Sequence, residues 1–171
     1  MEYKPEIIER LCCLEIFSDF DAKNDEHVQI LKQVCEKLEH KTYKSGELIL
    51  REGDIGDSLH ILYEGMVQIK RNTPGNEQFA VVNLTAEQNV FFGEVALVDK
   101  DTRSASVYAL TDCKTLYIND KDFIELCEKN LFLGYHVMHR ISKRIAASLR
   151  RSNKDMMTLY VALLDEVHGD D

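Results

Sequence analysis

The chain has 171 residues, which suggests one domain that buries about 70% of the surface its unfolded chain exposes. Its net charge of −9 argues against a general nucleic-acid binder, and no apolar run approaches the roughly 18 residues of a membrane span. Five cysteines without C-x-x-C spacing indicate reduced thiols, and the charged start from Met1 to Glu6 does not match a secretory signal; both favour the cytoplasm.

Residues 1–40 are predicted to form an N-terminal helical segment with helices from Pro5 to Cys13 and from Asn24 to Leu38. The second helix carries apolar residues at helical spacing, namely Ile30, Leu31, Val34 and Leu38. Four further apolar residues lie between the helices and predict a patch that packs them onto the next unit: Leu14, Ile16, Phe17 and Phe20.

Residues 41–119 change to short alternating or apolar segments separated by Gly and Asp, a pattern typical of strands. The expected strands are Glu47–Arg51, Ser58–Tyr63, Met66–Lys70, Gln78–Leu84, Ser106–Leu110 and Lys114–Ile118, with a hairpin loop at Asn72–Asn76. So many short strands predict a mostly β fold, a jelly-roll (double-stranded β-helix) barrel with flanking helices.

Residues 120–171 are predicted to be helical and to complete the same single domain. Asn119 and Asp120 offer an N-cap for a helix through Cys127, and a long helix then runs from about Leu131 towards Val167, with Gly134 as a hinge. Its apolar residues recur at steps of three, four and seven: Met138, Ile141, Ile145, Leu149, Met156, Leu159, Leu163 and Val167. This near-heptad seam, broken at Ser152, predicts a homodimer; alternatively the stripe packs on its own barrel.

A run of cations lies on the same helix between residues 140 and 154, with no acid among them: Arg140, Lys143, Arg144, Arg150, Arg151 and Lys154. Subtracting this +6 from the net −9 leaves −15 on the remainder of the chain. Two interpretations stay open. The run is either a solvated helix face balanced by acidic neighbours or a docking strip for an acidic partner or a ligand phosphate.

The segment Phe92-Gly93-Glu94-Val95-Ala96-Leu97, followed by Arg103-Ser104-Ala105-Ser106-Val107, carries the clearest chemistry. Gly93 allows a close approach of the backbone, and residues 94–97 can start a short helix whose N–H groups favour an anion. Arg103 can bind two phosphate oxygens, whereas Glu94 would repel a phosphate and suits a sugar hydroxyl instead. Phosphate and ribose in one segment indicate a nucleotide.

This segment resembles the phosphate-binding cassette of the cyclic nucleotide-binding domain family, the type found in the catabolite activator protein and in cAMP-dependent protein kinase regulatory subunits. The family pattern is F-G-E-x-A-L, a short spacer, then R-x-A-[ST], and residues 92–106 match it completely. A second family signature is also present, in the order Gly46, Ile49, Gly53-Asp54-Ile55-Gly56-Asp57, Leu59 to Leu62 and Gly65-Met66-Val67. The resemblance covers roughly residues 14–150.

The resemblance implies that eight cassette residues hold the ligand: Phe92, Gly93, Glu94, Val95, Ala96, Arg103, Ser104 and Ala105. On the long helix, Ser148 lies roughly where the family's helix reaches the adenine. Ser104 follows the arginine as in the catabolite activator protein, which favours cAMP, although a serine there can also serve guanine in cGMP.

The function that the resemblance implies is a non-catalytic sensor in which the ligand draws the long helix over the base and so signals to an unknown effector protein. No nucleophile–base grouping or H-x-H pair supports an enzyme, and neither DNA nor a membrane is expected as a partner. Two alternatives remain: the ligand-binding part of a cAMP-responsive transcription regulator without its DNA-binding domain, or a structural module with an unoccupied pocket.

Overall fold

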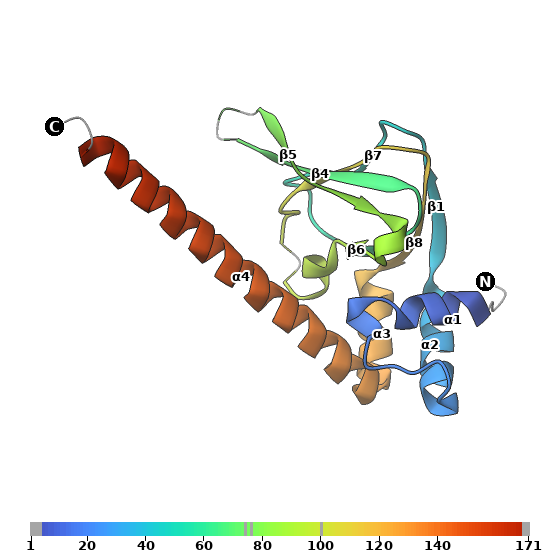
Figure 1. Ribbon diagram of the computed structural model, residues 1–171. Coiled ribbons are helices and arrows are strands. Elements are labelled where there is room, and N and C mark those ends of the chain that lie inside the picture. The colour runs from blue at the N-terminus through green and yellow to red at the C-terminus, as the bar shows by residue number, and fades with distance from the viewer. Residues whose placement is uncertain (1–4, 74, 76, 100, 169–171) are drawn as a thin grey trace.

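The computed structural model describes residues 5–73, 75, 77–99 and 101–168 (Figure 1). Pro74 and Asn76 of the expected hairpin loop, the charged first residues 1–4 and the last residues 169–171 lie outside this part, as do the side chains of Ala96, Val167 and His168. The helices are α1 (Pro5–Cys12), η1 (Glu15–Phe17), α2 (Asp25–Lys37), η2 (Ala86–Gln88), η3 (Glu94–Leu97), α3 (Asp120–Lys129) and α4 (Leu131–His168).

In the described part of the chain, eight antiparallel strands form two four-stranded sheets. They are β1 (Glu39–Tyr43), β2 (Leu48–Leu50), β3 (Ser58–Glu64), β4 (Met66–Asn72), β5 (Gln78–Thr85), β6 (Phe91–Phe92), β7 (Ser106–Ala109) and β8 (Cys113–Asn119). One sheet has the order β1-β8-β3-β6 and the other β2-β7-β4-β5. Strands pair as β1 with β8, β2 with β7, β3 with β6 and β4 with β5. The eight strands therefore form one long hairpin that is folded over itself. This nesting fits the expected jelly roll; closure into a barrel stays a prediction.

Two strands, β1 and β6, are not among those expected from the sequence. β1 begins at Glu39, so the expected boundary between residues 40 and 41 falls inside a strand. Its sequence is polar and its side chains are almost all exposed, which leaves no alternating pattern to find. β6 has only two residues, both buried, and it leads directly into the cassette.

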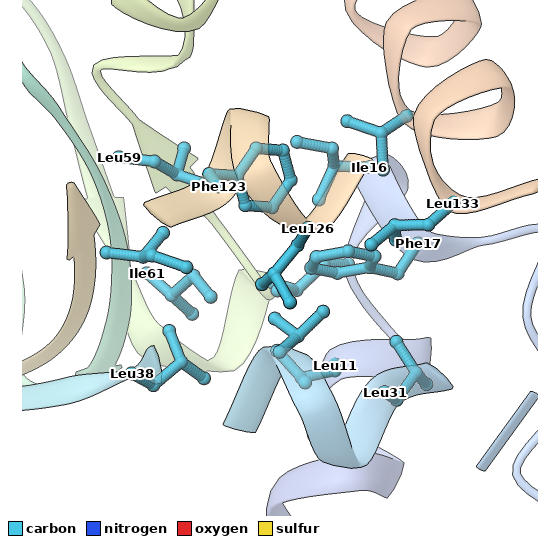
Figure 2. Packing of buried hydrophobic residues seen from close by; sticks show 14 of the residues in the cluster. Leu11, Ile16, Phe17, Leu31, Leu38, Leu59, Ile61, Phe123, Leu126 and Leu133 are labelled. Atoms are coloured by element: carbon cyan, nitrogen blue, oxygen red, sulfur yellow. The ribbon is translucent and has the colours of Figure 1, made fainter. Parts of the chain in front are cut away.

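The helices pack on one face of the first sheet and build the larger core (Figure 2). Leu59 and Ile61 of β3 face this core, and the expected patch before α2 lies fully inside it: Leu14, Ile16, Phe17 and Phe20. A smaller core between the two sheets includes Leu62 from the first sheet and Val67 and Val107 from the second. The first sheet therefore packs against the helices on one face and against the second sheet on the other.

Helix α4 starts in this helical base and then extends away from it (Figure 1). Leu133, Val137 and Ile141 are buried in the larger core, whereas the large apolar residues between Ile145 and Leu164 are exposed. A Cβ atom at Gly134 would lie 2.9 Å from the Cys127 carbonyl oxygen, so this glycine permits α4 to pack closely on α3. Among the described residues, no helix combines the length and the apolar character needed to cross a bilayer.

Candidate functional site

Gly93 joins β6 to η3 in a backbone conformation that other residues rarely adopt, with φ at +83°. A Cβ atom at this position would lie 2.7 Å from both Nη1 of Arg103 and the carbonyl oxygen of Ser58. The glycine is therefore required twice, for the turn itself and for the close approach of the arginine.

Arg103 is buried at the start of the return segment, with 8% of its surface exposed. Its Nη1 donates to the Gly93 carbonyl at 3.0 Å, its Nη2 donates to the Ser58 hydroxyl at 3.1 Å, and the Asp57 carboxylate lies 3.6 Å away. Burial lowers the pKa of Arg103, while the charges of Asp57 and Glu94 oppose that shift. The guanidinium has five N–H donors, so its two described hydrogen bonds leave capacity for a ligand.

The second sequence signature holds the backbone of this arginine. The Arg103 N–H donates to the Asp54 carbonyl at 2.8 Å, and the Gly53 N–H donates to the Arg103 carbonyl at 3.0 Å. The Gly56 N–H donates to the Asp101 carbonyl in the same way. The two motifs found separately in the sequence thus form one hydrogen-bonded unit.

Glu94, the first residue of η3, is mostly buried and contacts the long helix. Its Oε1 lies 3.1 Å from Nε of Arg144 in an ion pair, and 13% of its side chain is exposed. The Arg144 guanidinium lies 4.3 Å from the centre of the Phe91 ring and 3.9 Å from the Glu15 carboxylate. Arg103 and Glu94 therefore have different partners and do not form an ion pair with each other.

Both side chains line one pocket of about 170 Å³. Leu50, Ile69 and Val107 form apolar walls, and Arg144 of α4 also lines the pocket. The pocket brings together most of the residues expected from the sequence: Phe92, Gly93, Glu94, Val95, Arg103, Ser104 and Ala105. The pocket thus joins a buried cation, a carboxylate and an apolar wall, as a small polar ligand with an anionic group requires.

Ser148 and Ala96 are placed differently. Ser148 is exposed on α4 and lines an adjoining groove rather than the pocket, together with Glu94, Val95 and Ser104. Ala96 lies in η3 and contributes backbone there. Arg144 was expected only as one cation of a basic run, and no local pattern identifies it, because its partner Glu94 is fifty positions earlier.

His60 packs against Phe92, a lining residue of the pocket, and the sequence analysis assigned it no role. It is 2% exposed, and its ring stacks on Phe92 and Tyr117 with centroid distances of 5.5 and 5.6 Å. Its Nε2 lies 3.3 Å from the Ser58 hydroxyl that Arg103 also contacts. Burial, and then the charges of Arg103 and Lys41, lower the pKa of His60 to about 3, so the ring is neutral at neutral pH.

Potential metal ligands do not gather at this site: within the part of the chain that the structure describes, no group of three or more His, Cys, Asp or Glu side chains could hold a metal ion. His136 and His139 lie together on α4, where Tyr135 stacks on His139 and His136 faces the Asp19 carboxylate at 3.2 Å.

A two-sheet β fold with a cassette that presents a buried arginine and a glutamate defines a class of ligand-binding domain. The family model for the cyclic nucleotide-binding domain matches residues 40–130, more than half of the chain. The chain belongs to the cyclic nucleotide-binding domain family.

Three similar proteins illustrate this membership. The chain is 31% identical over 111 residues to a cAMP-dependent protein kinase regulatory subunit of Dictyostelium discoideum, covering 60% of this chain and 34% of that protein. Over 79 residues it is 35% identical to cGMP-dependent protein kinase 2 of Homo sapiens, covering 46% of this chain and 10% of the kinase. The regulatory domain of Toxoplasma gondii PKA, solved as a co-crystal with cAMP, has a TM-score of 0.68 at 25% identity and covers 84% of this chain and 50% of that one.

The buried, neutral His60 makes stability depend on pH. The unfolded chain binds a proton at this residue near pH 6.5, whereas the folded chain does so only near pH 3. Stability is therefore lost as pH falls through this window, by up to about 1.4 kcal/mol per pH unit. Urea unfolding at several pH values should show a shallower loss in His60→Phe, which keeps the ring stack, than in the wild type. Equal slopes in the two proteins would contradict the buried neutral imidazole.

Proposed function

We propose that this domain is a non-catalytic cyclic-nucleotide sensor that binds cAMP in preference to cGMP. One observation carries the proposal: Arg103 and Glu94 line the same pocket but have separate partners. In the proposed complex the Arg103 guanidinium and the N–H groups at the start of η3 bind the cyclic phosphate. The Glu94 carboxylate accepts from the free ribose hydroxyl.

The charge at Arg103 makes an anion the fitting ligand for this pocket. Asp57, its acidic neighbour, is 81% exposed and 3.6 Å away, so it compensates the buried cation only in part. An anion about 4 Å from the guanidinium would gain roughly 4 kcal/mol at an effective dielectric of 20, before its desolvation is subtracted. The phosphate of a cyclic nucleotide carries a single negative charge and supplies this compensation.

The preference for cAMP rests on Ser104 and on the groove beside the pocket. Ser104 lines both spaces, and Ser148 lines the groove, so the two hydroxyls flank the route from the phosphate site to the proposed base site. Relatives named for either nucleotide match the chain, and the Toxoplasma neighbour was solved with cAMP. Within this proposal cGMP is the weaker ligand.

The proposed output runs through the contact between Glu94 and Arg144. Arg144 uses only one carboxylate oxygen, so the other can accept from a ribose hydroxyl. The pocket of about 170 Å³ is small against the roughly 300–1,000 Å³ of most ligand sites, so we propose that a bound nucleotide displaces the Arg144 side chain, which lines the pocket. Ligand binding then shifts α4, provided that the ligand binds the shifted arrangement more tightly.

We also propose that α4 forms a homodimer. If Leu149, Met156 and Leu163 take heptad position a, then Ile145, Ser152 and Leu159 take position d. Apart from Ser152, these residues are 38–71% exposed. All six cations of the basic run fall at positions b, c and f, so an identical helix can pair along the seam without meeting like charges.

Removing the guanidinium should abolish tight binding. Arg103→Ala should weaken cAMP binding by about 100-fold or more, since a hydrogen bond to a charged group contributes about 1.5–3 kcal/mol and the long-range attraction adds to it. Isothermal titration calorimetry measures the affinity, and circular dichroism reports the fold. Arg71→Ala, an exposed arginine of β4, serves as the control and should bind like the wild type. A folded wild type that binds neither nucleotide would contradict the proposed function.

Arg144→Ala should separate ligand binding from helix movement. We expect cAMP affinity to change by less than about tenfold, because Arg103 still binds the phosphate, while the distance change between spin labels on α4 and β4 is lost. A variant that binds normally and still moves α4 would show that this ion pair does not transmit the signal.

Charges placed on the seam should dissociate the dimer. Met156→Glu with Leu163→Glu puts like charges opposite each other and should give a monomer in analytical ultracentrifugation, whereas Lys154→Glu at position f should not. A wild type that sediments as a monomer at high concentration would rule out the dimer.

A further inference from the structure

A second hollow, of about 810 Å³, lies between η1 and α4. Its α4 side carries two pairs of cations, Lys143 with Arg144 and Arg150 with Arg151, and Glu15 of η1 is its acidic lining residue. The two pairs are seven residues apart, which is two helical turns or about 10 Å. We call this hollow the basic groove.

The cations of the basic run are not equally compensated. Arg140 binds Asp19 through Nε at 2.7 Å and through a second contact, and Arg144 binds Glu94. Among the described residues no ion pair joins Lys143, Arg150 or Arg151 to an acid, and all three are exposed. A face balanced by acidic neighbours therefore accounts for the two compensated arginines only.

Small side chains separate the two pairs of cations. Ala146, Ala147 and Ser148 line the middle of the groove, so nothing large projects between the charged ends. In the proposed dimer these cations occupy positions b and c, which face away from the seam. The groove is thus lined by small side chains in its middle and carries uncompensated positive charge at each end, from Lys143 and from Arg150 with Arg151.

We propose that the basic groove docks a short acidic segment of a partner protein. Two cationic pairs about 10 Å apart match carboxylates spaced along a short peptide. An extended polyanion such as DNA would also lie along the rest of the chain, which carries −15.

A membrane surface fits the groove less well than an acidic peptide. The remainder of the chain carries −15, so an anionic lipid surface that extends beyond the groove would repel it.

Fluorescence anisotropy with a labelled synthetic peptide of Glu, Asp and Ala tests the groove on the full chain. The variant Lys143→Glu/Arg150→Glu/Arg151→Glu should bind at least about tenfold more weakly than the wild type. The matched control, Lys23→Glu/Arg71→Glu/Lys121→Glu, changes net charge equally at exposed cations elsewhere and should stay within about twofold. Ala147→Leu keeps the charge and the helix propensity, fills the middle of the groove and should also weaken binding.

Several results would overturn the proposal. These are no peptide binding by the wild type, equal losses in the two charge variants, or no effect of Ala147→Leu in a protein that circular dichroism shows to be folded. Duplex DNA or phosphatidylserine vesicles that bind the wild type more tightly than the peptide, at the same ionic strength, would assign the groove to a different partner. Cyclic-nucleotide titration of the same variants is independent of this result, since none of the substituted residues lines the nucleotide pocket.

Discussion

A buried guanidinium is costly unless its donors are satisfied, and the architecture of this domain is arranged around one. Arg103 is held by the Gly93 carbonyl, the Ser58 hydroxyl and the backbone of the loop at residues 53–57. These partners come from β3, the cassette and the loop before β3, so the position of the arginine depends on all three segments. Because the exposed Asp57 is a weak counter-charge, the fold leaves a rigid cationic site that an anion can complete.

The same arrangement supports the proposed coupling between the pocket and the long helix. Glu94 follows Gly93 directly, and its carboxylate is bound by Arg144 from α4. Arg144 also packs on the Phe91 ring, so one side chain joins β6, η3 and α4. Three residues before it, Ile141 is still buried in the helical core, whereas Ile145 is exposed. The contact therefore lies where α4 leaves the body, a position from which a small rotation moves the far end of the helix most.

Much of this was predictable because the signals are local. The cassette, the loop at 53–57 and the apolar patch before α2 are recognised by residue types at fixed short spacing, and the structure shows the patch within the helical core, as expected. Asn119 caps α3 as expected, through its acceptance of the Asp122 N–H. What the sequence could not supply depends on distant pairing. β1 is polar and is a strand only because β8 pairs with it, and Arg144 and His60 acquire their roles through partners that no local pattern connects.

The central claim is that Arg103 and Glu94 hold opposite ends of one cyclic phosphodiester. The most direct measurement is a calorimetric cycle with cAMP and 2′-deoxy-cAMP, which lacks the free ribose hydroxyl, on the wild type and on Glu94→Ala. We expect loss of the hydroxyl to weaken wild-type binding by about 10- to 100-fold, the range of a hydrogen bond to a charged group, and to have little effect in Glu94→Ala. Equal losses in both proteins would mean that Glu94 does not bind the sugar, and the account would be contradicted.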